Sequence, residues 1–237
     1  METFYTILDG LMLGDGSIFK ERPTGNARYC HDDHHILYVK YLMDLARKIG
    51  CTFAPNSPYP HYNKKYKSLT WAAQTHVDPF FTKEYFRWYS GGTKIIPTDL
   101  ILTPDILRHL YIGDGCLGYD RERVTHINFA THCFSTESKE IFREKMEQLN
   151  FPLNFCKNGS MNLKKSCVEY FLSYIGKCPI SCYQYKWSIE NRDTYNILKN
   201  GICCQETISS EVSKHEERRA RETFDGHPLI GVDPKPD

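Results

Sequence analysis

The sequence LDGLMLGDG occupies residues 8–16, and the related sequence LRHLYIGDG occupies residues 107–115. In both copies an apolar stretch with helical spacing stops at Gly-Asp-Gly. Asp114 in the second copy follows Asp15 in the first by 99 residues, the size of one small α/β half. A repeat of this length indicates duplication rather than a solenoid of short repeats. We therefore predict two similar halves, each beginning with this helix.

The segments that follow the two copies also match. Each copy is followed by two strands joined by a polar turn, then by a helix, two more strands and a closing helix. The elements predicted in the first half are strands within 17–33, a helix at 35–49, strands at 52–54 and 67–74, and a helix at 79–89. Those predicted in the second half are strands within 116–134, a helix at 137–149, strands at 154–157 and 161–164, and a helix at 168–175. The order predicts an α+β fold, αββαββα twice over, with pseudo-symmetry and two antiparallel β-sheets.

Turn and cap signals divide the chain into four parts. Ser90-Gly91-Gly92-Thr93 is typical of a hinge, and Thr103-Pro104 is typical of the start of a helix. The predicted parts are a first half at 1–92, a linker at 93–103, a second half at 104–205 and a C-terminal tail at 206–237. The tail has few residues that could form a core, so we expect it to be disordered or loosely docked.

Composition excludes several classes of protein. Of the 237 residues 41% are hydrophobic, too many for a disordered chain, and no apolar run is long enough to cross a membrane. The first residues lack the basic segment of a signal peptide. The net charge is only +1. Residues 1–205 hold 25 basic and 21 acidic residues, whereas the tail holds five basic and eight acidic residues. The body is therefore mildly basic.

Ten cysteines raise the question of disulfides or zinc. Without a signal peptide, reduced thiols are the expected state. Cys178 and Cys182 are separated by three residues, and Cys203 and Cys204 are adjacent. A structural zinc site usually has two pairs of cysteines separated by two residues, so small, half-buried side chains are the favoured interpretation.

Asp15 and Asp114 carry charges that are unfavourable where they stand. A helix C-terminus has partial negative charge, so a carboxylate there favours a nearby cation. Carboxylates and backbone carbonyls are ligands suited to Mg²⁺ or Mn²⁺. Gly10, Gly14 and Gly113 would let two such helices pack closely and bring their ends together. The alternative is that each Asp-Gly makes an ordinary turn after a helix.

The two motifs resemble the LAGLIDADG motif of homing endonucleases, and the chain resembles the single-chain, two-motif members encoded within introns. The resemblance covers about residues 4–205. His109 stands where the family has a small residue, whereas Asp15 and Asp114 match the acid that binds metal. The resemblance implies the LAGLIDADG fold, Mg²⁺ or Mn²⁺ as cofactor, double-stranded DNA as partner and a monomer without a small-molecule substrate. Members occur in organelles, archaea, bacteria and phage.

The resemblance also implies roles for individual residues. The metal ligands would be Asp15, Asp114 and the carbonyls of Gly14 and Gly113. The catalytic lysines would be Lys94, in the sequence KIIP, and Lys186, in the sequence YKW. His31 and His132 stand where the family usually has glutamine, which suggests a shared role such as positioning solvent. The alternatives are two surface histidines that happen to align and, for Lys186, a surface lysine beside an aromatic residue.

The resemblance implies that the two sheets bind the major groove of DNA. Alternate residues of a strand share one face, so polar residues at period two can contact base edges. The predicted DNA-binding residues are Lys20, Arg22, Arg28, Lys65, Lys67 and Gln74 in the first half, and Arg121, Arg123, His126, Asn128, Asn162 and Lys164 in the second. Any one of them could instead be a solvated residue or a phosphate contact.

Three functions fit this resemblance. The favoured one is a site-specific endonuclease that hydrolyses both strands of DNA at a long recognition site and leaves short 3′ overhangs. The second is an intron RNA maturase, a splicing factor on the same scaffold. The third is a non-catalytic DNA-binding protein. Retention of Asp15 and Asp114 favours cleavage.

Overall fold

The computed structural model describes residues 2–63, 68–189 and 192–199. Two predicted DNA-binding residues, Lys65 and Lys67, and the predicted tail at 206–237 lie outside the described residues. Residues 1–199 form one compact unit that contains both copies of the motif. Within the described part of the chain, no helix is long and apolar enough to cross a membrane.

The first half has the predicted order of elements. Its helices are α1 (Phe4–Leu13), α2 (Ile36–Arg47) and α3 (Pro79–Trp88), and its strands are β1 (Ser17–Phe19), β2 (Arg28–Asp33), β3 (Tyr59–Asn63) and β4 (Ser68–Gln74). The strands form an antiparallel sheet in the order β1-β2-β4-β3. Helix α1 begins at a capping box between Thr3 and Thr6.

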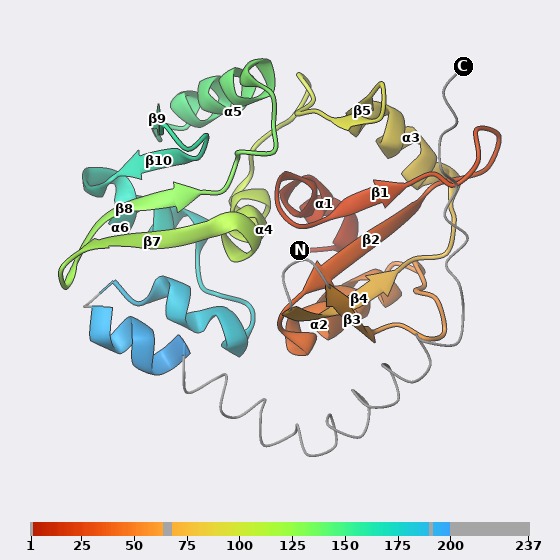
Figure 1. The fold of residues 1–237 in the computed structure, drawn as a ribbon, viewed down its shortest axis with the longest axis horizontal. Helices are drawn as coiled ribbons and strands as arrows, with labels where there is room; N and C mark the ends of the chain where they lie inside the picture. The colour runs from red at the N-terminus through yellow and green to blue at the C-terminus, as the bar shows by residue number, and fades with distance from the viewer. Residues whose placement is uncertain (1, 64–67, 190–191, 200–237) are drawn as a thin grey trace. The chain divides into compact units, whose positions relative to one another are not determined.

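The second half repeats this arrangement. Its helices are α4 (Pro104–Asp114), α5 (Thr136–Gln148) and α6 (Lys165–Ile175), and its strands are β7 (Gly115–Asp120), β8 (Arg123–Phe129), β9 (Leu153–Phe155) and β10 (Met161–Lys164). Its sheet has the order β7-β8-β10-β9, which matches the first sheet strand for strand (Figure 1). A 3₁₀ helix, η1 (Ser181–Trp187), and a short α-helix at 192–199 follow α6. The predicted duplicated α+β fold is confirmed.

One predicted strand is wrong. Residues 52–54 contribute only an isolated bridge from Phe53 to Thr75, and the strand that completes the first sheet is β3. The prediction missed β3 because Pro58 and Pro60 are typical of a loop. A proline is tolerated there because β3 is an edge strand, on which a missing backbone N–H need not break a ladder.

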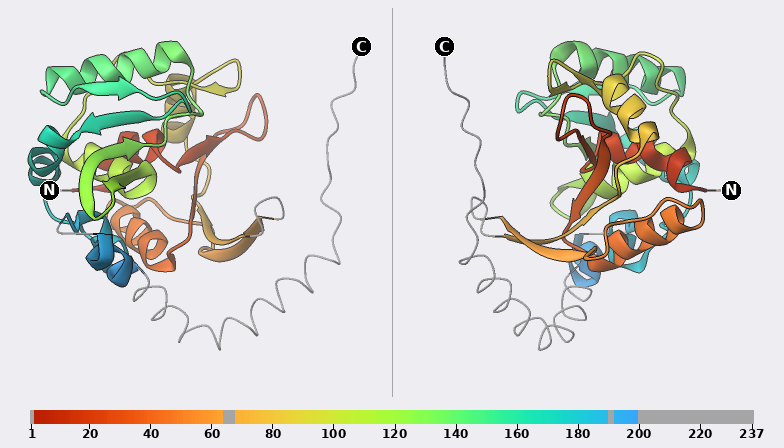
Figure 2. Two further views of the ribbon diagram at one scale, coloured as in Figure 1. Left: turned by 60° about the vertical axis from the view of Figure 1, so that its left-hand side comes forward. Right: turned by 90° about the vertical axis from the view of Figure 1, so that its right-hand side faces the viewer.

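Each sheet has one buried and one outer face. In β2, Tyr29, His31 and Asp33 are buried, whereas the alternating residues Arg28 and Cys30 are partly exposed and Asp32 is exposed. Helix α2 covers the buried face of the first sheet through Val39 and Met43, which pack against Ala73 of β4. The second sheet is covered by α5 and α6, whose Phe142 and Phe171 rings lie 6.1 and 5.7 Å from Phe129 (Figure 2).

The predicted hinge is an ordered hairpin. Strands β5 (Tyr89–Ser90) and β6 (Thr93–Lys94) pair directly, and the two residues between them, Gly91 and Gly92, have φ angles of +56° and +79°. A two-residue hairpin turn with both φ angles positive favours glycine at both positions. The hairpin fixes Lys94 at the start of the predicted linker.

Candidate active site

The two motif helices pack against each other along their glycine faces. Helices α1 and α4 lie side by side between the two sheets (Figure 1). A β carbon at Gly10 would overlap the backbone carbonyl of Ile106, so the backbones approach as closely as glycine allows. At the other end of the pair, a β carbon on Gly113 would lie 3.3 Å from Oδ2 of Asp15 and 3.7 Å from the α carbon of Gly14. Close packing therefore brings the two acidic helix ends together.

Both acids lie where a carboxylate is costly to ionise. Asp15 is exposed, yet the protein around its carboxylate displaces water and raises its pKa, an effect that Lys186 and Lys94 partly oppose. Burial, together with the negative charge of Asp15, raises the pKa of Asp114 to about 7. The mutual repulsion shows that the two carboxylates share one electrostatic environment. A cation between them would relieve it.

The two predicted catalytic lysines occupy matching positions. Lys94 Nζ donates hydrogen bonds to the carbonyls of Gly14 and Gly16, at 3.1 and 2.8 Å. Lys186 Nζ donates to the carbonyls of Gly113 and Gly115, at 3.2 and 2.8 Å, which are the same positions of the second motif. The ammonium groups thus neutralise the partial negative charge of both helix ends.

Burial lowers the pKa of Lys94 and of Lys186 to about 8, although the carboxylates of Asp15 and Asp114 oppose this effect. Lys186 is 6% exposed and also contacts the carbonyls of Tyr111 and Ile112. It is therefore not a surface lysine. Both lysines remain largely protonated at neutral pH, so each half places one positive charge beside its acid.

His31 and His132 are not equivalent in the structure. Ser17 of β1 pairs with Cys30, and Cys116, which corresponds to Ser17 in the second half, pairs with Asn128. Cys30 therefore corresponds to Asn128. His31, the next residue along β2, corresponds to Phe129. His132 lies three residues further on, exposed in the turn that follows β8. The symmetric placement suggested by the sequence is wrong, because the two sheets keep the same register and His132 lies three residues beyond the position that corresponds to His31.

His31 lies in the core of the first half. It is 3% exposed, its Nδ1 lies 2.8 Å from the hydroxyl of Tyr29, and its Nε2 has no hydrogen-bond partner within the described residues. Burial, with smaller contributions from His109 and Lys94, lowers the pKa of His31 to about 3. A neutral imidazole inside the core is a structural element rather than a group in contact with solvent.

Replacing His31 by phenylalanine, the residue at the equivalent position of the second half, is expected to make folding less sensitive to acid. The pKa of His31 is lower in the folded protein, at about 3, than in the unfolded chain, at 6.5. Protonation therefore favours the unfolded chain, so the stability that is present above pH 6.5 is lost as the pH falls towards 3. The loss amounts to about 5 kcal/mol at most. Urea unfolding between pH 7 and pH 4 measures it, with the exposed His76→Asn as control. An unchanged pH dependence in His31→Phe would contradict this assignment.

A buried hydrogen bond between Tyr183 and Asp33 joins the two halves. The hydroxyl of Tyr183, in η1, donates to both carboxylate oxygens of Asp33, in β2, at 2.8 and 2.7 Å. Asp33 also accepts a bond from the backbone N–H of His35. Lys186 Nζ lies 5.0 Å from the centre of the Tyr183 ring. The sequence did not indicate this contact, because its two partners are 150 residues apart.

His109 joins the halves in the same way. It is 1% exposed, and its two ring nitrogens lie 2.7 Å from the hydroxyl of Tyr38 and 2.9 Å from Oε1 of Glu2. Both partners belong to the first half. The histidine that replaces a small residue of the motif therefore serves the interface between the halves.

Tyr183→Phe is expected to destabilise the fold more at high pH than at low pH. Burial raises the pKa of Asp33 to about 6, and the bond from Tyr183 opposes that rise by favouring the charged form. Without the hydroxyl, ionised Asp33 loses a partner, which costs about 2 kcal/mol at pH 8. At pH 4, below the folded-state pKa of about 6, the native carboxyl is protonated and the loss is smaller. Urea unfolding at pH 8 and pH 4 tests this, with the exposed Tyr170→Phe as control; equal losses at both pH values would rule it out.

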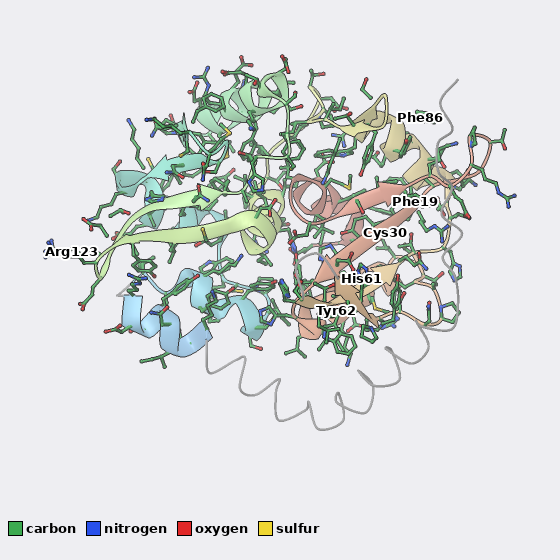
Figure 3. The ribbon with its side chains drawn as sticks, viewed as in Figure 1. Phe19, Cys30, His61, Tyr62, Phe86 and Arg123 are labelled. Atoms are coloured by element: carbon green, nitrogen blue, oxygen red, sulfur yellow. The ribbon has the colours of Figure 1, made fainter. Side chains whose placement is uncertain are left out.

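Those predicted DNA-binding residues of the first half that the structure describes lie at its outer face and its β1–β2 loop. Gln74 pairs with Cys30, and its side chain lies 3.4 Å from the guanidinium of Arg28. Lys20 and Arg22 lie in the loop, where Lys20 donates to the carbonyl of Arg22. Figure 3 labels Cys30 and two further residues of this sheet, Phe19 and His61.

In the second half, four of the predicted DNA-binding residues lie on the outer face of the sheet and two lie at its hairpin turn. Asn128 is flanked by Asn162 on β10, and His126 is flanked by Lys164. Oδ1 of Asn162 is buried and has no hydrogen-bond partner in the described part of the chain. Arg121 and Arg123 lie at the β7–β8 turn, and Figure 3 shows Arg123 at the far end of that hairpin. The sheet therefore presents amide, imidazole and ammonium groups together.

A divalent cation fits the donors at the helix ends. The carboxylates of Asp15 and Asp114 and the carbonyls of Gly14 and Gly113 are hard oxygen ligands. Each glycine carbonyl accepts a bond from a lysine, and a carbonyl oxygen has a second lone pair. Across the described residues, no three histidine, cysteine or acidic side chains form a cluster that could hold a metal by themselves.

Comparisons with known proteins bear on the family and the fold. The pattern of the LAGLIDADG DNA endonuclease family matches residues 5–174. The structure of the homing endonuclease I-WcaI bound to its DNA recognition sequence has a TM-score of 0.64 and 22% identity, covering 78% of this chain and 88% of that one. I-DmoI in complex with DNA and manganese has a TM-score of 0.47 and 14% identity, covering 73% and 95%.

One curated protein is similar in sequence. It is an uncharacterized protein of Methanocaldococcus jannaschii, 28% identical over 156 residues. The match covers 62% of this chain and 57% of that protein's length. The family pattern spans both motifs, both acids and Lys94, and ends before Lys186. With the duplicated fold and the paired helix ends, this shows that the chain belongs to the LAGLIDADG DNA endonuclease family.

Proposed function

We propose that this protein is a site-specific endonuclease that cuts both strands of a DNA duplex with the help of Mg²⁺ or Mn²⁺. The observation that carries the proposal is the meeting of Asp15 and Asp114 at the ends of α1 and α4, with one lysine beside each. One chain supplies two matched sets of groups, as a cut in each strand requires. No second copy is needed, so we propose a monomer.

The chain's own groups would hold and orient the scissile phosphates. Asp15 and Asp114, with the carbonyls of Gly14 and Gly113, would hold the divalent ion, which acts as a Lewis acid on a phosphoryl oxygen. The ammonium groups of Lys94 and Lys186 are fixed by their bonds to backbone carbonyls. They would stabilise the negative charge that develops on the phosphate as water attacks.

The proposal gives His31 and His132 no part in the reaction. His31 is buried beside the hydroxyl of Tyr29, and His132 lies in the turn after β8, the strand that corresponds to β2. Short 3′ overhangs and a long recognition site remain part of the proposal. The presence of two sheets supports a long recognition site, and the family resemblance implies the overhangs.

The outer faces of the two sheets would bind the duplex. With a net charge of only +4 in residues 1–205, bulk attraction to DNA is modest, and binding depends on where the polar side chains stand. Gln74 and Arg28 in the first sheet, and Asn128, Asn162 and Lys164 in the second, stand at period two on those faces.

Selection from a randomised duplex DNA library tests this function. We expect the full chain to retain a single family of sequences in buffer without divalent metal. A structured intron RNA is the competitor in a parallel binding assay. Retention of the RNA alone, with faster splicing, would favour the maturase and overturn the proposal. A retained duplex that stays intact with Mg²⁺ would favour the non-catalytic DNA-binding protein.

A further inference from the structure

The outer faces of the two sheets differ at one matched position. The 99-residue offset between the motifs equates Phe19 with Gly118, and the strand registers equate Arg28 with His126. In each sheet the two residues are direct cross-strand partners: Phe19 faces Arg28, and Gly118 faces His126. The first half therefore presents an aromatic ring and a guanidinium where the second presents an imidazole and no other side chain.

Phe19 is an apolar residue on a polar surface. It is 53% exposed and lies near the β1 edge of the first sheet (Figure 3). The guanidinium of Arg28 lies 5.7 Å from the ring centre and is held by Glu21 at 2.9 Å and by Gln74 at 3.4 Å. These contacts hold a cation beside the ring while leaving over half of Phe19 open to a partner.

The second half blocks the same position. A β carbon at Gly118 would overlap the imidazole of His126, so the ring of His126 lies across the glycine. The hydroxyl of Thr125 lies 2.9 Å from Nδ1 of that imidazole and helps to hold it there. A hydrogen-bonding ring thus takes the space that an apolar side chain occupies in the first half.

We propose that Phe19 determines specificity by contacting the 5-methyl group of a thymine in the half of the target that lies under the first sheet. This rests on the proposed DNA endonuclease function. In the major groove thymine presents a methyl group, and an apolar side chain is its matching contact. The second half, with His126 over Gly118, makes no such contact, so the target is asymmetric at this position.

The test combines a protein variant with removal of one methyl group from the DNA. Wild type and Phe19→Ser each select binding sequences from a randomised duplex library without divalent metal. We expect one thymine to be enriched by the wild type and not by the variant. Replacing that thymine by deoxyuridine, which lacks only the methyl group, should weaken wild-type binding roughly fourfold and leave Phe19→Ser unchanged.

Phe86→Ser is the matched control. Phe86 is 67% exposed on α3 and lies 5.8 Å from Nζ of Lys20, but it is not on the sheet. This variant should keep the thymine preference and the response to deoxyuridine.

Two results would overturn the inference. If Phe19→Ser selects the same thymine, or if wild type binds the deoxyuridine duplex equally well, then Phe19 does not contact the methyl group, although the proposed function stands. If the wild type retains no duplex at all, the proposed function fails and the inference fails with it.

Discussion

Replacing Asp114 or Asp15 by asparagine is expected to abolish double-strand cleavage and to spare DNA binding. Each substitution keeps the shape of the side chain and removes one of the two charges that would hold the divalent ion. Loss of Lewis-acid stabilisation worth several kcal/mol slows the reaction by at least about 10³-fold. Cleavage of a plasmid that carries the selected target, followed on an agarose gel with Mg²⁺, measures the loss.

Stability provides the control for these two variants. Asp15 and Asp114 repel each other across the helix ends, so removing one charge should not destabilise the fold. Urea unfolding of Asp15→Asn and Asp114→Asn should show wild-type stability or better. Full cleavage by either variant would remove that residue from the metal site.

Gly10→Ala is expected to destabilise the protein by about 3 kcal/mol and to lower its melting temperature by roughly 6–12 °C. The added β carbon would overlap the backbone carbonyl of Ile106, and a backbone atom cannot move aside as a flexible side chain can. In an unpacked helix the same change would stabilise by about 1 kcal/mol, so a net loss reports the packing of α1 on α4. Calorimetry of the purified chain measures it.

Gly14→Ala is the matched substitution. It lies one helical turn away, where the nearest atom to an added β carbon is 3.7 Å distant, an ordinary contact. Its stability should remain close to that of the wild type. If Gly10→Ala and Gly14→Ala were equally stable, the close approach of the two helices at Gly10 would be refuted.

The fold could be predicted from the sequence because local signals and the repeat agreed. Apolar residues at helical spacing, the Thr103-Pro104 helix start and the glycine turn at Gly91 and Gly92 each depend on nearby residues. Strand β3 was missed because Pro60 is unfavourable in a strand except at a sheet edge, and an edge is defined only by the tertiary arrangement.

The candidate site was predictable where it repeats and not where it depends on contacts between the halves. Asp15, Asp114, Lys94 and Lys186 lie at matched positions. The pairing of Tyr183 with Asp33 had no local signal, since no pattern in one strand or helix specifies a partner 150 residues away. His31 was assigned to the wrong environment because its local sequence resembles that around His132, although His132 lies three residues beyond the equivalent position and outside β8.

The exposed ring of Phe19 was also missed. Composition and spacing directed attention to polar residues, because hydrogen bonds dominate base recognition. An apolar residue on β1 is ordinarily expected to face the core, and only the pairing with Arg28 on the outer face shows otherwise.

Strand-resolved cleavage of the selected duplex tests the central claim most directly. The duplex is labelled at both 5′ ends, incubated with the full chain and Mg²⁺, and run on a denaturing gel, with a parallel sample in EDTA. We predict one cut in each strand with Mg²⁺, staggered to leave a short 3′ overhang, and none in EDTA. Two intact strands in every divalent metal, with the duplex still bound, would contradict the account.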